Sequence, residues 1–376
     1  MLAKTPPMGW NSWNTFGENI HADLIKETAD AFVANGLKDA GYTYLVIDDC
    51  WSEYDRDSVT DKIVPHKEKF PNGMNDVSDY VHSKGLKFGM YSCAGVRTCA
   101  DYPGSFDHEF LDARTFAEYG ADFLKYDFCY KPDSSTGPIL YHRMGTALSV
   151  CGREILFSAC NWGNDNVHRW IRSTGAQMYR STGDINDCFD SFKDIFLSQE
   201  KNFCFSAPGC FNDIDMLTVG MYGNGNVANG NACNDTDYKT QFSLWCLFAS
   251  PLMLGCDLRN MTSETLRLVT NKNLIAINQD SETRPPFRVG ARGESHIFAR
   301  RLANGDFAFG MFNFGEREEN VPLLFFETGL TANSGYAFEL TDCFTDEKVG
   351  VYKDYFSVKI QPHDCAVYRG RLVPVK

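Results

Sequence analysis

Short apolar segments alternate with amphipathic segments along the first 280 residues of the chain, and this alternation restricts the fold more than any other feature. The amphipathic stretches, such as 24–41 and 113–121, carry apolar residues at three- and four-residue spacing, which predicts helices. Eight apolar segments are predicted as strands: 7–13, 42–49, 86–92, 122–128, 154–160, 176–184, 203–209 and 248–255. Strands that alternate with helices form parallel sheets, and eight such units over this length favour a closed (β/α)8 TIM barrel.

A doubly wound open sheet is the alternative arrangement of the same units. An open sheet concentrates its ligand site at one topological switch point. Here nearly every predicted strand ends in polar residues, and no GxGxxG sequence follows the first strand. Both observations favour the barrel.

The pattern changes after residue 280. The segment SETRPPFRVG has the Pro and Gly residues of a linker or turn. The segments that follow it are short, aromatic and alternating, with no helical spacers, which predicts an antiparallel β-sandwich. We therefore predict a catalytic barrel at 1–284 and a C-terminal antiparallel β domain at 285–376.

The composition narrows the classes of partner. The formal net charge of −13 repels phosphate backbones, so nucleic acid is not expected as a partner, and a neutral substrate fits better than an anionic one. Apolar runs such as 248–255 are too short to cross a bilayer. The N-terminus lacks an apolar stretch of signal-peptide length, so we expect a cytoplasmic location. The 14 cysteines show no zinc-site spacing, and most are expected to be reduced and buried.

The carboxyl ends of the predicted strands form a candidate site, because catalytic groups of (β/α)8 enzymes lie there. Aromatic faces can stack on a sugar ring, carboxylates and amides can bind hydroxyls, and glycoside hydrolysis requires two carboxyl groups. The strand ends and the loops after them supply Trp10, Asp48, Asp49, Trp51, Tyr91, Lys125, Asp127, Asn161, Trp162, Arg180, Asp184, Asp213 and Asp215.

The segment FLKYDFCY carries Lys125 and Asp127 two positions apart, so both side chains point to the same side of a strand. Asp127 would act as nucleophile or base, and Lys125 would favour its ionised form and donate to a sugar hydroxyl. The residues alone leave two other interpretations open. Lys125 and Asp127 could form a buried ion pair, and the neighbouring pair Asp48 and Asp49 could cap a helix or bind Mg²⁺.

Seven motifs spread along the chain resemble one known family. They are PPMGWNSWN, IDDCW, LKYDFCY, RSTGDI, NDIDML, ASPLMLGCDLR and AINQD, and they resemble the α-galactosidase / α-N-acetylgalactosaminidase family, glycoside hydrolase family 27. The resemblance covers the whole chain. It implies a (β/α)8 barrel followed by an antiparallel β domain, and a retaining double-displacement mechanism that uses no metal or other cofactor.

The resemblance also implies residue roles. It makes Asp127 the nucleophile and Asp184 the acid/base, with Arg180 as its arginine. It places Trp10, Asp48, Asp49 and Lys125 on galactose, with the aspartate pair holding the 4- and 6-hydroxyls, and this replaces the Mg²⁺ interpretation. Tyr91, Trp162 and Asp215 are expected to complete the sugar site.

The chain departs from the family pattern at the fifth strand. Many α-galactosidases read C-E-W-G or C-E-W-P there, and the Glu contacts the sugar near O2, whereas this chain has Asn161. Members that cleave N-acetylgalactosaminides carry Ser and Ala around this position, and Asn161 and Asn164 match neither. We therefore predict an α-galactosidase, with α-N-acetylgalactosaminidase and β-L-arabinopyranosidase as alternatives and a non-enzymatic galactose-binding protein as a less favoured one.

Two expectations concern covalent and subunit structure. Cys99 and Cys129 occupy positions that are paired in secreted relatives, so they are a candidate disulfide, although a reducing cytoplasm would favour the open thiols. Cys50 has no evident partner. The expected partner is a small carbohydrate with a terminal α-galactoside, and an aromatic-rich C-terminal domain is compatible with a homo-oligomer.

Overall fold

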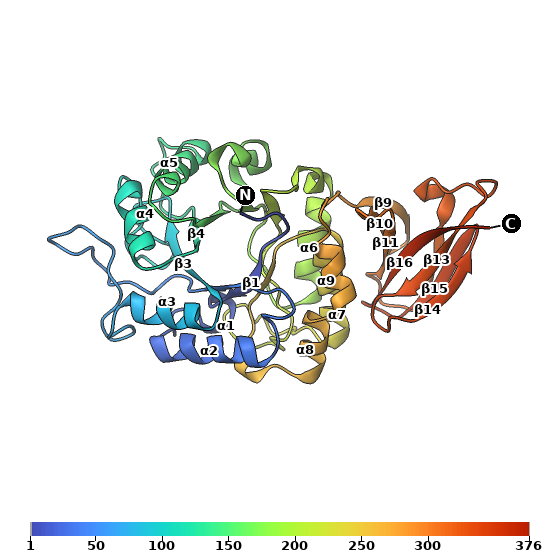
Figure 1. The fold of residues 1–376 in the computed structure, drawn as a ribbon, viewed down its shortest axis with the longest axis horizontal. Helices are drawn as coiled ribbons and strands as arrows, with labels where there is room; N and C mark the ends of the chain where they lie inside the picture. Colours follow the sequence, from blue (N-terminus) through green and yellow to red (C-terminus); the bar gives the residue numbers. More distant parts are fainter. Residues whose placement is uncertain (1, 376) are drawn as a thin grey trace.

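The computed structural model describes residues 2–375 and shows two domains that follow one another along the chain (Figure 1). The first is built from parallel strands with helices outside them, and the second consists almost entirely of antiparallel strands. This is the predicted fold class.

The strands of the first domain form one eight-stranded sheet in the order β7-β6-β5-β4-β3-β2-β1-β8, and all neighbours run parallel. The strands are β1 (Met8–Asn11), β2 (Tyr44–Val46), β3 (Lys87–Cys93), β4 (Phe123–Asp127), β5 (Leu156–Cys160), β6 (Met178–Arg180), β7 (Phe211–Asp213) and β8 (Leu252–Leu254). Nearly all their residues are buried, as expected for a sheet that helices cover on its outer side.

The barrel closes through the segment after β7 rather than through a ladder between β7 and β8. The amide of Leu217 donates to the carbonyl of Met253 at 2.8 Å, and the amide of Gly255 donates to the carbonyl of Leu217 at 3.1 Å. Leu217 therefore joins the two ends of the strand order.

Helices surround the sheet, and local sequence signals define their ends. In α7, Asn234 and Asp237 form a reciprocal capping box. No helix among residues 2–375 is long and apolar enough to cross a membrane. The α-helices are α1 (Trp13–Phe16), α2 (Ala22–Ala34), α3 (Met74–Ser83), α4 (Glu109–Glu118), α5 (Gly137–Ser149), α6 (Phe189–Gln199), α7 (Asp235–Leu247), α8 (Ser263–Val269) and α9 (Lys272–Asn278).

The prediction of a strand at 203–209 is wrong. The 3-10 helix η3 (Glu200–Phe205) occupies its first half, and β7 begins only at Phe211. The apolar side chain of Phe203 packs outside the barrel, with its ring centroid 4.0 Å from that of Phe248. A short apolar run does not distinguish a strand from a buried helical turn, and here the run belongs to the outer layer.

The C-terminal domain consists of two antiparallel sheets. Six strands lie in the order β14-β13-β16-β11-β10-β9, and β12 pairs with β15. Aromatic side chains fill the space between the sheets; the rings of Phe325 and Phe338, for example, lie 5.0 Å apart. The strands are β9 (Phe287–Arg292), β10 (Ser295–Arg301), β11 (Phe307–Asn313), β12 (Glu319–Leu324), β13 (Tyr336–Asp342), β14 (Lys348–Tyr352), β15 (Tyr355–Ile360) and β16 (Cys365–Pro374).

The outer face of the six-stranded sheet packs on the barrel beside α6 and α7 (Figure 1). The ring of Phe298 lies 5.1 Å from that of Phe248, and Lys239 forms an ion pair with Asp364 at 2.7 Å. The buried guanidinium of Arg300 donates to the carbonyls at the C-terminal end of α7. The two domains therefore share an apolar core that ion pairs and hydrogen bonds reinforce.

Candidate active site

A pocket of about 280 Å³ opens at the carboxyl ends of the barrel strands. The period of two along a strand decides which side chains reach it, because alternate residues point to the same side. On β4, Phe123, Lys125 and Asp127 all line the pocket. The polar and aromatic groups around it are Asn11, Trp13, Asn14, Asp48, Asp49, Tyr91, Lys125, Asp127, Ser158, Cys160, Trp162, Arg180, Asp184, Asn186, Asp213, Asp215 and Asn226.

Asp127 lies at the end of β4 with 6% of its surface exposed. Its carboxylate accepts hydrogen bonds from the Tyr91 hydroxyl at 3.1 Å and from the Phe128 amide at 3.0 Å. Burial raises the pKa of Asp127, and the nearby positive charge of Lys125 opposes this effect. Lys125 therefore favours the ionised carboxylate, as the sequence predicts, but burial is the larger influence.

Lys125 forms its ion pair with Asp48 rather than with Asp127. Its ammonium lies 2.8 Å from Asp48, whose side chain is 2% exposed and also accepts a hydrogen bond from Asn11 at 2.7 Å. Burial is the largest single influence and lowers the pKa of Lys125, but the charge and hydrogen bond of Asp48 together with the charge of Asp127 act in the opposite direction, and the net shift is upward. Both carboxylate oxygens of Asp48 already accept hydrogen bonds, one from Lys125 and Asn11 and the other from the Asp49 amide, so these residues do not fit the Mg²⁺ site considered from the sequence.

Asp49 is held by backbone donors from two loops. It accepts hydrogen bonds from the Cys50 amide at 2.7 Å and from the Ala100 amide at 3.1 Å. Burial raises the pKa of Asp49 to about 6, although the Thr98 hydroxyl acts in the opposite direction. This carboxyl group therefore changes its charge within a pH range in which enzymes work.

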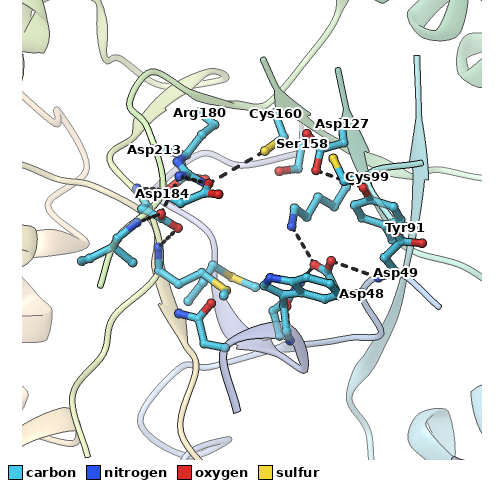
Figure 2. A pocket seen from close by; sticks show the side chains of 18 of the residues that line it. Asp48, Asp49, Tyr91, Cys99, Asp127, Ser158, Cys160, Arg180, Asp184 and Asp213 are labelled. Carbon is cyan, nitrogen blue, oxygen red and sulfur yellow. Dashed lines mark hydrogen bonds and ion pairs between the residues drawn. The ribbon is translucent and has the colours of Figure 1, made fainter. Parts of the chain in front are cut away.

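Arg180, at the end of β6, connects two carboxylates. It lies 2.8 Å from Asp184, whose side chain is 85% exposed, and 2.5 Å from Asp215, which is buried. Burial raises the pKa of Asp215, while Arg180 lowers it. Asp213 lines the same wall, and burial raises its pKa to about 6 while Arg180 opposes the rise. Figure 2 shows Arg180, Asp184 and Asp213 across the pocket from Asp127, Tyr91 and Asp49.

Three of the candidate residues predicted at the strand ends do not line the pocket. Trp51 is buried, and its indole donates to the Tyr91 carbonyl at 2.9 Å. Trp10 is fully buried, and its indole donates to the Cys256 carbonyl at 2.8 Å. Asn161 is also fully buried, and its amide donates to the Asn164 carbonyl at 2.9 Å. The reason is strand alternation: Asn11 on β1 and Cys160 on β5 face inward, so Trp10 and Asn161 face outward.

Sequence reasoning missed several lining residues. Trp13 takes the place expected for Trp10, and Cys160 takes the place expected for Asn161. β1 and β5 have only four and five residues, so the sequence carries little signal for which of their residues face inward. Asn226 and Val227 come from an irregular loop with no periodic signal. The predicted residues Asp48, Asp49, Tyr91, Lys125, Asp127, Trp162, Arg180, Asp184, Asp213 and Asp215 do meet in the pocket.

Cys99 and Cys129 are joined in a disulfide, and Cys99 lines the pocket. Asp127 and these two cysteines form the group of potential metal ligands found among the described residues. Their sulfurs are bonded to each other and are not thiolate ligands, so this group does not fit a metal site. Cys50 is a free thiol, as the sequence predicts, and it is buried.

Comparisons with known proteins agree with the motifs. Residues 5–280 match the family model described as alpha galactosidase A, and residues 292–369 match that of the alpha galactosidase C-terminal beta sandwich domain. The chain is 40% identical over 372 residues to alpha-galactosidase 3 of Arabidopsis thaliana, covering 98% of this chain and 82% of the plant protein. The crystal structure of alpha-galactosidase I from Mortierella vinacea is similar with a TM-score of 0.92 and 32% identity, covering 98% and 97% of the two chains.

Proposed function

This chain belongs to the α-galactosidase family of glycoside hydrolases, and we propose that Asp127 and Asp184 are the carboxyl groups with which it releases terminal α-linked galactose. One observation carries the assignment of roles. The two carboxyl groups face one pocket from opposite sides and have opposite surroundings (Figure 2). Asp127 is buried and fixed by donors, whereas Asp184 is exposed to solvent at the edge of the pocket.

These surroundings suit the two roles of a retaining glycosidase. A nucleophile must be rigid and ionised, and Tyr91, the Phe128 amide and Lys125 all favour the ionised form of Asp127. An acid/base must reach both the leaving oxygen and water. The exposed Asp184 can do so while Arg180 restrains it.

The reaction then follows two displacements. An oxygen of Asp127 attacks the anomeric carbon, the bond from this carbon to the leaving oxygen breaks, and Asp184 donates its proton to that oxygen. Water next attacks the covalent galactosyl-enzyme, and Asp184 takes a proton from it. The bond to Asp127 breaks, and α-galactose is released with its original configuration.

The residues across the pocket from Asp184 indicate the substrate class. Asp48 and Asp49 offer carboxylate oxygens for sugar hydroxyls, and Lys125 offers a donor between Asp48 and Asp127. This group fits a neutral galactose ring with its 6-hydroxyl. A β-L-arabinopyranoside lacks the hydroxymethyl arm, so it would lose contacts with the aspartate pair.

Active-site variants test the two roles. Asp127→Asn should abolish turnover of nitrophenyl α-galactoside and raffinose alike, because no other group can form the covalent intermediate. Asp184→Ala should slow raffinose more than nitrophenyl galactoside by roughly a hundredfold, since a nitrophenolate needs little protonation. Asp112→Asn and Asp190→Ala are matched controls, one buried and one exposed, outside the pocket. Near-normal turnover by Asp127→Asn, or equal losses for both substrates in Asp184→Ala, would contradict the assignment.

A panel of nitrophenyl glycosides tests the sugar. We expect kcat/KM to be highest for the α-galactoside, lower for the β-L-arabinopyranoside and lowest for the α-N-acetylgalactosaminide. A higher kcat/KM for the N-acetyl sugar would overturn the substrate assignment while leaving the catalytic roles intact.

A further inference from the structure

Asp215 holds the loop that carries Asp184 from two sides. Its carboxylate lies 2.5 Å from Arg180 on the N-terminal side of this loop, and it accepts a hydrogen bond from the Ile185 amide at 2.8 Å on the C-terminal side. Asp184 itself is contacted only at the Arg180 guanidinium among the polar groups of residues 2–375. No helix or strand spans 181–188, so side-chain contacts hold this loop. Arg180 also donates to the Gly183 carbonyl at 2.7 Å, and the Ile185 side chain is buried in the core, but Asp215 is the side chain that contacts both Arg180 and the Ile185 amide.

Asp215 is itself fixed to the barrel. Trp245 on α7 donates from its indole to the Asp215 carbonyl at 2.8 Å, and the Met216 amide donates to the Asp215 carboxylate at 2.6 Å. The backbone of Asp215 has a φ of 88°, a conformation that non-glycine residues adopt only where the surroundings enforce it. The following residues join the barrel at Leu217. A strained and well-anchored backbone therefore aims this carboxylate at Arg180.

The neighbours of the Asp215 carboxylate are all donors: the Arg180 guanidinium and the amides of Ile185 and Met216. An ionised carboxylate satisfies such a set, whereas a protonated one would have to place its own hydrogen among donors. The buried Asp215 therefore neutralises Arg180, and the exposed Asp184 contacts the same guanidinium from the solvent side. The other titratable groups close to this guanidinium are Asp213 and the Cys160 thiol.

We propose that Asp215 is a positioning residue for the acid/base: it aims the Asp184 loop and offsets the charge of Arg180, so that Asp184 can carry the proton that it donates. This inference rests on the proposed role of Asp184. It also gives Asp215, which the sequence predicts to bind the sugar, a role in positioning Asp184.

The pH dependence of Asp215→Asn tests the charge role. Without the Asp215 charge, Arg180 favours the ionised Asp184 carboxylate more strongly, so the protonated acid persists only at lower pH. We expect the alkaline limb of the kcat/KM profile for raffinose to move down by roughly one pH unit. We also expect raffinose turnover to fall about tenfold more than nitrophenyl galactoside turnover. An unmoved alkaline limb together with equal losses for both substrates would overturn the proposal.

Two further variants keep the test decisive. Trp245→Phe removes the donor to the Asp215 carbonyl but keeps the carboxylate, so it should reduce raffinose turnover selectively without moving the alkaline limb. It serves alone if Asp215→Asn does not fold, and equal losses for both substrates would then count against positioning. Asp112→Asn breaks a comparable buried pair with Arg56 that does not line the pocket, so it should lose stability without either catalytic effect.

Asp184→Ala separates the two levels of inference. If Asp184→Ala shows no preference for good leaving groups, the proposed function of Asp184 fails, whatever Asp215→Asn does. If Asp184→Ala shows that preference and Asp215→Asn shows neither effect, only the positioning role fails.

Discussion

Replacing Lys125 with methionine would remove the cation that lies 2.8 Å from Asp48 while keeping a side chain of similar length. Lys125 is 18% exposed and Asp48 is 2% exposed, so the methionine variant would leave a buried carboxylate with only the Asn11 amide and the Asp49 backbone as polar partners. Removing one member of a buried ion pair costs about 3–5 kcal/mol, because the remaining charge stays desolvated. We expect Lys125→Met to lose that much unfolding free energy at pH 7.

A double-mutant cycle with Asp48→Asn measures the pair itself. The double variant buries no charge at this position, so it should be about 1–3 kcal/mol more stable than the sum of the single losses indicates. The surface pair of Lys26 and Asp76, at 2.7 Å but 23% and 33% exposed, provides the control cycle. Its coupling should stay below about 1 kcal/mol. Urea denaturation measures all variants, and equal coupling in the two cycles would refute the reasoning from burial.

The same variant has a catalytic consequence with a defined sign. Burial raises the pKa of Asp127 and Lys125 lowers it, so losing Lys125 raises the pKa further. The ionised nucleophile then exists only at higher pH, and the acid limb of kcat/KM should move upward. A carboxyl group whose pKa is higher in the folded protein than in the unfolded chain stabilises the fold when it becomes protonated. The loss of unfolding free energy in Lys125→Met should therefore shrink as the pH falls from 7 toward 4.

Three other variants or conditions test separate parts of the site. Because burial raises the pKa of Asp49 to about 6, galactose should inhibit less strongly as the pH falls through 6, and Asp49→Asn should weaken this dependence to the part that Asp213 contributes; a pH-independent inhibition constant for the wild type would contradict it. Trp13→Ala should raise KM, because Trp13 lines the pocket. Trp10→Phe should leave KM unchanged but lower the unfolding free energy by about 1–3 kcal/mol, because the Cys256 carbonyl loses its donor. The opposite pattern would show that Trp10, and not Trp13, contacts the substrate. Reduction of the disulfide between Cys99 and Cys129, which are 30 residues apart, should lower stability by about 3–4 kcal/mol and raise KM, and a double serine variant should show both effects and no response to reductant.

Strand periodicity predicts much of the site, but it is informative on some strands and not on others. On β4 it places Lys125 and Asp127 on one side, and the structure has both in the pocket. On β1 and β5 the family pattern pointed to Trp10 and Asn161, although the inward phase belongs to Asn11 and Cys160. The deviation has a physical cause: strands of three to five residues leave little sequence from which to read a phase.

Other features depend on contacts that no local pattern records. The helical turn at Phe203 and the late start of β7 follow from packing against Phe248 in the outer layer. The closure of the barrel at Leu217 and the anchoring of Asp215 by Trp245 join segments that are distant in the sequence. The alternation of strands and helices predicts the architecture, because it reflects burial that every unit repeats. The contact at Leu217 that closes the barrel occurs only once, so no repeated sequence pattern predicts it.

The strand order leaves one edge of β1 unpaired for a long time while the chain is being synthesised. Strand β1 leaves the exit tunnel first, but one of its two edges pairs only with β8, where Trp10 is opposite Leu254. At elongation rates of about 5–20 residues per second, that edge stays open for roughly 12 to 50 seconds in every molecule made. An unpaired apolar edge recruits other strands, so nascent chains held close together on one message are exposed to mispairing throughout this interval. Chains that terminate before residue 254 keep this edge unpaired permanently, because they lack the strand that closes the barrel.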